Sequence, residues 1–321
     1  MRVVFFGTPD LAATVLQKVH ESGYEIVCCV TQPDKPVGRK MILTAPPAKE
    51  KALELGIPVW QPQSLRKDEA LETLRSYAPD LIITAAYGKI LPQTMLDLPK
   101  YGAINVHGSL LPKYRGAAPV QWSILNLDEK TGVTIMKMDA GMDTGDILTQ
   151  AEIKIEDTDH TTTLMQKLAD LGAELLVSTL PDYLEGKIKP IPQDPELATV
   201  APPISKEQGN IDWNRTAAQI CAQIRALSQW PGASTVWKDG RMKIYDAVVD
   251  EKSESLLEQY IANCGQPVSG TVIFAKKGVL AVMCQDKPLN LLEVQPSSGK
   301  RMKVTDCAHN FEVGKVMGEE A

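Results

Sequence analysis

The chain has 321 residues, 44% hydrophobic and 23% charged, a composition typical of a globular protein that is long enough for two domains. Its net charge of −6 excludes a chain that is basic overall, so any surface for nucleic acid would have to be local. The negative charge lies in residues 1–205, with 20 basic against 26 acidic side chains, whereas residues 206–321 carry 14 of each.

The first residues and the cysteines indicate the compartment. The stretch RVVFFGTPD after Met1 predicts a strand and a turn, with no charged or amphipathic leader and no long apolar span. The six cysteines form no CxxC pair, and Cys28 and Cys29 adjoin each other in the apolar run YEIVCCV. We therefore expect a cytoplasmic protein with reduced, packed thiols and no membrane partner, and we expect a monomer.

The first half alternates between short apolar runs and amphipathic patterns whose apolar residues lie three and four positions apart. This alternation predicts a parallel sheet with right-handed crossover helices. Two further strands and a long amphipathic helix over 161–184 follow. Residues 1–189 are thus predicted to form an open, doubly wound, Rossmann-like α/β domain with a mostly parallel sheet. The predicted strands are 3–6, 25–30, 57–60, 80–86, 103–107, 133–138 and 146–155.

A linker and a smaller domain are predicted after residue 189. Five prolines and no regular period mark the region around 190–208 as a partly extended linker. Residues 209–321 begin with a helix over 216–228, and then show short apolar strands separated by Gly, Pro and charged turns. That spacing predicts an antiparallel β-barrel of roughly five strands, OB-like in type, with 250–270 as a long polar excursion.

The turn FGTPDLAA after the first strand superficially resembles a phosphate loop. It lacks the GxGxxG and GxxxxGK[ST] patterns, and Pro9 removes a backbone donor. A plain helix start, with Thr8 as N-cap and Pro9 as the first helical residue, explains it better. A nucleotide or phosphorylated substrate at this turn is correspondingly disfavoured.

Asn105 and His107 stand two positions apart at the carboxyl end of a predicted strand, so they share one face at the edge where open parallel sheets build sites. Such a pair needs a carboxylate partner. The Gly-rich loop DAGMDTGDIL offers Asp139, Asp143 and Asp146. These acids could instead be solvated turn residues, or a cation site with a threonine of the loop; we expect no metal.

Two segments carry a family resemblance. AINVHGSLLPKYRGAAPVQW and GVTIMKMDAGMDTGDIL resemble the hallmark of the folate-dependent formyltransferases. Six further blocks extend the resemblance over nearly the whole chain, and specifically to the branch of that family that acts on charged initiator tRNA. They are GTPDLAA, TQPDKPVGRK, AAYGKILP, SKEQGNIDW, IRALSQWPGAST and LLEVQPSSGKRM.

The resemblance implies transfer of a formyl group from 10-formyltetrahydrofolate to the amino group of initiator methionyl-tRNA. An α-amine has a reference pKa of about 7.7 to 8.0, so no strong protein base is required. The oxyanion formed on attack needs hydrogen-bond donors, which Asn105 and His107 can supply. By the family pattern Asp143 is the third member, interacting with His107 and accepting the amine's proton.

The resemblance also implies where the substrates bind. The folate would lie between the turn after the Asn–His strand and the AAYGKILP segment. The acceptor end of the tRNA would meet Lys35, Arg39 and Lys40, although the loop continues as MILTAPP and the second domain is neutral, where relatives tend to be basic. The expected folate-lining residues are Ser109, Leu110, Leu111, Pro112, Tyr87, Gly88 and Ile90.

Three alternatives stay open. The same chemistry could serve an amino-sugar nucleotide or glycinamide ribonucleotide, although the second-domain blocks and the missing phosphate loop disfavour both. A non-catalytic RNA-binding protein would not need Asn105, His107 and Asp143 together. Hydrolysis of the formyl-folate by the same residues would be a side reaction.

Overall fold

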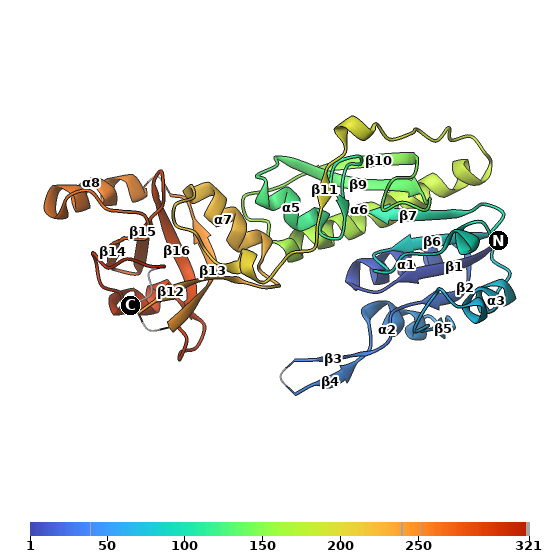
Figure 1. Cartoon of the computed structure of the whole chain (residues 1–321), viewed down its shortest axis with the longest axis horizontal. Coiled ribbons are helices and arrows are strands. Elements are labelled where there is room, and N and C mark those ends of the chain that lie inside the picture. The colour runs from blue at the N-terminus through green and yellow to red at the C-terminus, as the bar shows by residue number, and fades with distance from the viewer. Residues whose placement is uncertain (39, 239, 251, 319–321) are drawn as a thin grey trace. The chain divides into compact units, whose positions relative to one another are not determined.

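The computed structural model describes residues 1–38, 40–238, 240–250 and 252–318 (Figure 1). The chain forms two compact units. Unit 1 comprises Met1–Pro119, Lys130–Lys154 and Leu164–Pro202; unit 2 comprises Val120–Glu129, Ile155–Thr163 and Pro203–Ala321. The boundaries at 189 and 209 inferred from the sequence stay a prediction.

Unit 1 is built on a seven-stranded sheet in the order β10-β9-β7-β6-β1-β2-β5. The pairings from β7 to β5 are parallel, whereas β9 and β10 are antiparallel, which confirms the doubly wound, mostly parallel fold. The strand order reverses between β1 and β6, whose carboxyl ends form a topological switch point. The strands are β1 Arg2–Gly7, β2 Glu25–Val30, β5 Val59–Trp60, β6 Leu81–Ala85, β7 Ala103–His107, β9 Lys130–Lys137 and β10 Ile147–Lys154.

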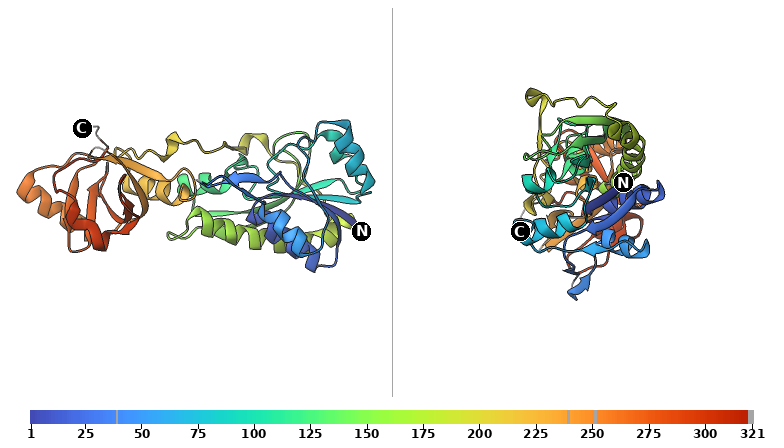
Figure 2. Two further views of the ribbon diagram at one scale, coloured as in Figure 1. Left: turned by 90° about the horizontal axis from the view of Figure 1, so that it is seen from below. Right: turned by 90° about the vertical axis from the view of Figure 1, so that its right-hand side faces the viewer.

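Helices cover both faces of this sheet (Figure 2). Val4 and Phe6 of β1 share a core cluster with Leu74 of α3 and Met95 of α4. On the other face α1 and α6 lie side by side, and Gly172 of α6 sits close to β7 and β9. Because successive strand residues point to opposite faces, both sets are buried. The helices are α1 Asp10–Glu21, α2 Pro47–Glu54, α3 Asp68–Ser76, α4 Gln93–Leu96, α5 Pro119–Leu125 and α6 Thr161–Leu184.

The start of α1 differs from the prediction. The helix begins at Asp10, and Pro9 is its N-cap with an extended backbone (φ −81°, ψ −175°). Thr8 is therefore not the cap. Its hydroxyl instead donates to the Tyr87 carbonyl (3.0 Å), which ties the turn after β1 to the segment after β6.

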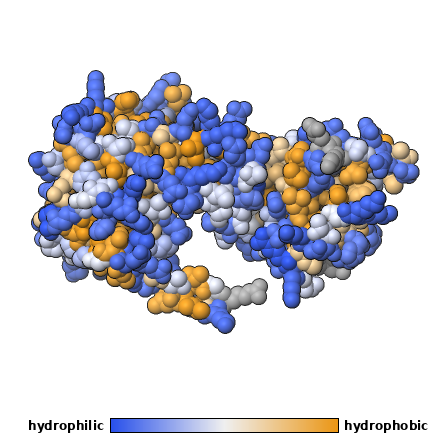
Figure 3. Space-filling view, turned by 180° about the vertical axis from the view of Figure 1, so that it is seen from behind, coloured by the Kyte–Doolittle hydropathy of each residue, from blue (hydrophilic) through white to orange (hydrophobic). Residues whose placement is uncertain are grey.

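A small hairpin, β3 Lys35–Val37 and β4 Ile42–Thr44, was not predicted. Each strand has three residues, too few to give a periodic pattern. Val37, Ile42 and Leu43 are all more than half exposed, and Figure 3 shows apolar side chains gathered on this projection.

The predicted linker is largely attached to unit 1. Its Val200–Ala201 (β11) pairs in parallel with Arg115–Gly116 (β8), and Ile191 forms an antiparallel bridge with Ile147 of β10. Two short 3-10 helices, η1 Pro195–Leu197 and η2 Glu207–Gly209, interrupt it. Strand pairings of one or two residues are too short to produce an alternation of apolar and polar residues in the sequence. The proline-rich composition therefore predicts a loose linker where the structure has these short pairings.

Unit 2 contains an antiparallel sheet in the order β12-β13-β16-β15-β14, with β17 on β16, which confirms the second domain's antiparallel sheet. Among the described residues no strand pairing joins β12 to β14. Residues 314–318 bridge them instead, since Gly314 N donates to Val272 O of β14 (2.8 Å) and Gly318 N to Val236 O of β12 (2.9 Å). The strands are β12 Ala233–Trp237, β13 Gly240–Val248, β14 Val272–Lys276, β15 Val279–Met283, β16 Pro288–Gln295 and β17 Met302–Lys303.

Three helical segments accompany this sheet. α7 (Ala217–Ala226) starts with a capping box in which Thr216 and Gln219 exchange side-chain-to-backbone hydrogen bonds. The region predicted as a polar excursion contains a helix, α8 (Lys252–Cys264), whose many polar residues obscured its period. α9 (Val304–Cys307) and η3 (Ala308–Asn310) follow β17. No helix in the described part of the chain is long and apolar enough to span a bilayer.

The six cysteines are free, and four of them are buried, as predicted. Cys264, at the end of α8, is exposed, so the prediction of packed thiols is wrong there. Burial raises the pKa of Cys28 to about 11 and that of Cys29 to about 12.

The thiols should therefore react at very different rates. At pH 8 we expect an aromatic disulfide reagent to modify Cys264 rapidly in the native protein, and Cys28 and Cys29 only after unfolding, because the thiolate is the nucleophile. Stopped-flow absorbance with peptide mapping measures this, and Cys264→Ser should remove the fast phase. Fast native-state labelling of Cys28 or Cys29 would contradict the burial.

Candidate active site

The site is centred on the carboxyl end of β7. Ile104 and Val106 of this strand are buried in the core. Asn105 and His107 alternate with them and therefore share the opposite face, as the sequence predicts. His107 is 5% exposed, so its ring is held among protein atoms rather than in bulk water.

The Asn105 amide is oriented by a neighbour on β6. Thr84 pairs directly with Asn105 in the sheet, and its hydroxyl lies 2.6 Å from Asn105 Oδ1. The same hydroxyl lies farther from the Ile104 carbonyl (3.3 Å) and from Met138 Sδ (3.2 Å). Donation to Oδ1 leaves the amide NH₂ group of Asn105 to donate to a ligand.

The His107 ring is oriented by a backbone carbonyl. Nε2 lies 3.0 Å from the Tyr114 carbonyl oxygen, which can only accept, so Nε2 carries a proton and donates. The other nitrogen, Nδ1, lies 3.6 Å from Asp143 Oδ2. Nδ1 is thus the ring atom that faces the carboxylate; it is an acceptor in the neutral ring and can donate only in the imidazolium form.

Asp143 reaches the ring from a tightly turned loop. Its φ of +55° lies in the left-handed region, which aspartate tolerates better than most residues. Its Oδ2 accepts a hydrogen bond from Gly116 N (2.9 Å), so the carboxylate is held on two sides. The structure thus brings Asn105, His107 and Asp143 to the same edge of the sheet.

The other acids of this loop do not join them. Asp139 Oδ1 accepts from Gly141 N (3.1 Å) and from Thr144 Oγ1 (2.7 Å), closing its own exposed turn. The Asp146 carbonyl accepts from Lys137 N of β9. Within the described residues, no group of three His, Cys, Asp or Glu side chains is arranged to hold a metal ion.

The turn after β7 is the first expected folate wall. Ser109 is fully buried and its hydroxyl donates to the Lys113 carbonyl (2.6 Å). Leu111 is also buried, with its N–H on Thr134 Oγ1 (3.0 Å). Leu110 and Pro112 keep partial exposure. Ser109 and Leu111 therefore shape the turn, whereas Leu110 and Pro112 keep part of their surface exposed.

The opposite wall is mostly backbone. The Tyr87 ring is 3% exposed and packs edge-on against Phe6 in the core, and burial raises the pKa of its hydroxyl to about 12. Because the ring is buried, the Tyr87 side chain does not line a cleft. Its carbonyl accepts from Thr8 and from Gln32 Nε2 (2.9 Å). Gly88 has a φ of +80°, and Ile90 is 74% exposed.

The basic residues expected to meet RNA lie on the hairpin. Lys35 is exposed on β3 and its Nζ donates to Gln32 Oε1 (2.7 Å). Lys40 is exposed in the hairpin turn, and Arg39 lies outside the described residues. The base of the hairpin is anchored by Lys49, whose Nζ contacts both Asp34 carboxylate oxygens (2.8 and 2.9 Å). That hydrogen bond lowers the pKa of Asp34.

Sequence reasoning missed two residues of the site. Thr84 is the single polar residue in the buried strand LIITA, next to its carboxyl end, and that isolation was an available signal. Gly116 acts through its backbone N–H, for which no side-chain pattern exists.

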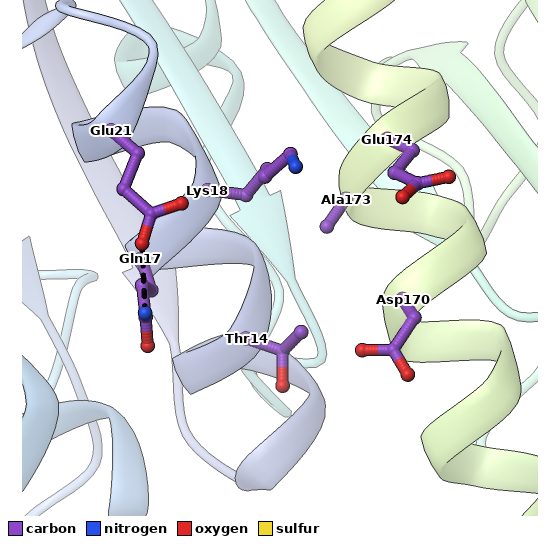
Figure 4. Close-up of a pocket in the computed structure, with 7 residues that line it drawn as sticks. All are labelled: Thr14, Gln17, Lys18, Glu21, Asp170, Ala173 and Glu174. Carbon is purple, nitrogen blue, oxygen red and sulfur yellow. Dashed lines mark hydrogen bonds between the residues drawn. The ribbon is translucent and has the colours of Figure 1, made fainter.

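A groove between α1 and α6 lies apart from these residues (Figure 4). Glu21, Asp170 and Glu174 contribute three carboxylates against the single ammonium of Lys18. Glu21 is engaged with Gln17 (2.8 Å). This lining is typical of two solvated helix faces and contains none of the residues predicted for chemistry.

Comparison with known proteins identifies the family. The family described as "Formyl transferase" matches residues 1–180, and "Formyl transferase, C-terminal domain" matches residues 203–312. Among solved structures, HypX from Aquifex aeolicus (TM-score 0.64, 17% identity, 95% of this chain and 48% of that chain) shares the fold. So does the sugar 3N-formyl transferase WlaRD (TM-score 0.63, 17% identity, 94% and 99%).

Curated relatives are much more similar in sequence. The chain is 44% identical to the methionyl-tRNA formyltransferase of Halalkalibacterium halodurans, with 99% of this chain and 98% of the relative aligned. It is 45% identical to that of Bacillus subtilis (99% and 98%) and 47% identical to that of Listeria monocytogenes (98% and 95%). The chain therefore belongs to the formyl transferase family, and within it to the methionyl-tRNA formyltransferases.

Proposed function

We propose that this chain transfers the formyl group of 10-formyltetrahydrofolate to the α-amino group of initiator methionyl-tRNA, giving N-formylmethionyl-tRNA. The observation that carries the proposal is the convergence of Asn105, His107 and Asp143 at the carboxyl end of β7. Similarity to relatives of this activity over both units supports the acceptor.

The first step is attack of the neutral amine on the formyl carbon, which forms a C–N bond and an oxyanion. The Asn105 NH₂ group, oriented by Thr84, is the proposed donor to that oxygen. A preorganised donor of this type contributes about 2.7 to 4 kcal/mol to other acyl transfers. Because the sheet holds the amide before the reaction, little reorganisation is required as charge develops.

The second step moves protons and breaks the bond to the folate. The attacking amine becomes an ammonium, and its proton passes to Asp143 or His107 Nδ1, directly or through a water. As the carbonyl re-forms and the C–N bond to the folate breaks, that same proton passes from Asp143 or His107 Nδ1 to the leaving nitrogen of the folate, which restores the starting state of both side chains. With Nε2 bonded to Tyr114, Nδ1 can take part without rotation of the ring.

The folate is proposed to bind between Leu110 and Pro112 on one side and the Tyr87–Gly88 backbone and Ile90 on the other. A flat bicyclic ring suits partly exposed apolar side chains for its faces and turn backbone groups for its edge. Ser109 and Leu111 would support this site from beneath, since the Ser109 hydroxyl is hydrogen-bonded within the turn and the Leu111 N–H is bonded to Thr134 of β9.

The tRNA is proposed to contact the β3–β4 hairpin through Lys35, Arg39 and Lys40, and residues 209–321 are the proposed tRNA-binding domain. Because neither part of the sequence is basic overall, the tRNA is proposed to contact a local group of basic residues and not a broad basic surface. Charged tRNA as acceptor implies a cytoplasmic enzyme.

Formyl transfer from 10-formyltetrahydrofolate should be measured on charged initiator tRNA, on charged elongator methionine tRNA and on free methionine. We expect formylation of the charged initiator and little of the other two. Consumption of the folate with no formylated tRNA would indicate hydrolysis or a different amine, such as an amino-sugar nucleotide, and would overturn the proposed acceptor.

His107→Ala and Asp143→Ala should each lower kcat by roughly 10²- to 10⁴-fold, the range typical of lost general acid–base groups. Thermal unfolding should show that both variants fold. Asp139→Asn is the matched control: it lies in the same loop and bonds only within its own turn, so it should retain kcat within about threefold. Near-normal turnover in either alanine variant would refute the assigned roles.

Lys35→Ala with Lys40→Ala should weaken tRNA binding and flatten its dependence on salt, because each phosphate contact contributes about 0.7 to 0.9 to the log–log slope. Filter binding between about 50 and 200 mM salt measures this slope. Lys18→Ala, on α1, which removes one positive charge away from the hairpin, serves as the control and should leave the slope unchanged. An unchanged slope in the double variant would move the RNA contact away from the hairpin.

A further inference from the structure

Residues 191–199, in the stretch predicted as a linker, run past the loop that carries Asp143. They are attached to the rest of unit 1 upstream and downstream of that point. Ile191 exchanges backbone hydrogen bonds with Ile147 (2.8 and 2.9 Å), and farther on Arg115 N donates to the Thr199 carbonyl (2.8 Å). Between these attachments, Gln193 is the residue whose side chain contacts the loop.

Both ends of the Gln193 amide are engaged. Nε2 lies 2.8 Å from the Asp143 carbonyl and 2.7 Å from the Gly145 carbonyl, so both of its protons are donated to the loop. Oε1 accepts from Arg115 Nε (3.0 Å) and Nη2 (2.8 Å). A guanidinium can only donate, so Arg115 determines which end of the amide faces the loop.

The loop needs such support because of its backbone. Asp143 has a φ of +55°, and a non-glycine residue keeps this conformation only where its surroundings hold it. At Gly145 a Cβ would lie 1.8 Å from the Lys137 carbonyl oxygen, so the loop is folded closely against β9. The direction of the Asp143 carboxylate follows from these backbone angles.

We propose that Gln193 is a positioning residue for Asp143, with Arg115 as its support; this role rests on the proposed function. The dipeptide Arg115–Gly116 then acts on Asp143 in two ways. Gly116 N–H binds the carboxylate, and Arg115 holds the Asp143 main chain through Gln193. The last stretch of unit 1, before residue 203, is therefore part of the proposed support of Asp143.

The test is a double-mutant cycle. Gln193→Met keeps the length of the side chain and removes its hydrogen bonds, and it is made in the wild type and in Asp143→Asn. In the wild type we expect single-turnover formyl transfer to slow by about 10- to 100-fold, with the KM values for folate and tRNA within about twofold. In Asp143→Asn we expect less than a twofold further loss, since coupled residues are not additive.

The controls separate positioning from general stability. Gln223 also donates to two backbone carbonyls, those of Gln208 (2.6 Å) and Asn210 (2.9 Å), but within unit 2. Gln223→Met should lower the melting temperature comparably and keep the rate within about twofold. Arg115→Met, which frees the Gln193 amide to turn, should slow the rate in the same coupled manner and replaces Gln193→Met if that variant does not fold.

A readout independent of turnover keeps this role distinct from the proposed function. Imidazole ¹⁵N NMR of the four histidines, with His107 assigned by its loss in His107→Ala, reports the surroundings of Nδ1. Gln193→Met should shift the His107 Nδ1 resonance in the direction that Asp143→Asn does. An unmoved resonance, or equal rate losses in both backgrounds of the cycle, would overturn the positioning role, whatever the acceptor proves to be.

Discussion

The hydrogen bond from His107 Nε2 to the Tyr114 carbonyl determines how the rest of the site can work. A carbonyl oxygen only accepts, so the bond assigns a proton to Nε2 and turns Nδ1 toward Asp143. If the carbonyl were displaced, the ring could take the other tautomer, with its proton on Nδ1. The Asp143 carboxylate would then face a protonated Nδ1, which could no longer accept a proton from the substrate. The chemistry therefore depends on the turn that presents Tyr114 as much as on the imidazole itself.

The proposed catalytic groups come from two kinds of structure. Asn105 and His107 come from a strand, whose position is set by ladder hydrogen bonds and by Thr84 on the neighbouring strand. Asp143 comes from a loop and has a left-handed backbone conformation, which an aspartate does not adopt without support from its surroundings. Strand residues need little further support, whereas the loop residue requires hydrogen bonds from outside, and Gly116 supplies one of them directly to the carboxylate.

The features predicted correctly from the sequence are those that follow from a regular spacing of residues. The alternation along 103–107 predicted that Asn105 and His107 share a face, and apolar spacing predicted the helix over 161–184 with the observed bounds. Three features escaped it for physical reasons. The Tyr87 ring belongs to the core because its strand-end position faces Phe6, the Tyr114 carbonyl acts without a side chain, and the pairings of 190–208 are too short to show alternation.

The Gln32 side chain connects the β3–β4 hairpin to the segment that follows β6, and in the proposed function these are the RNA contact and one folate wall. The Tyr87 carbonyl accepts from Gln32, whose Oε1 in turn accepts from Lys35 on β3. Asp34 beside them is paired with Lys49, and its lowered pKa means that the pair persists until the pH falls through a value below aspartate's usual range. The base of the hairpin is thus held while its apolar end stays exposed. If Lys35 makes the proposed RNA contact, a phosphate that draws its Nζ away from Gln32 Oε1 removes one of the two bonds that hold the Gln32 amide. The other end of that amide binds the Tyr87 carbonyl, so the proposed RNA contact and the proposed folate wall would be linked through Gln32.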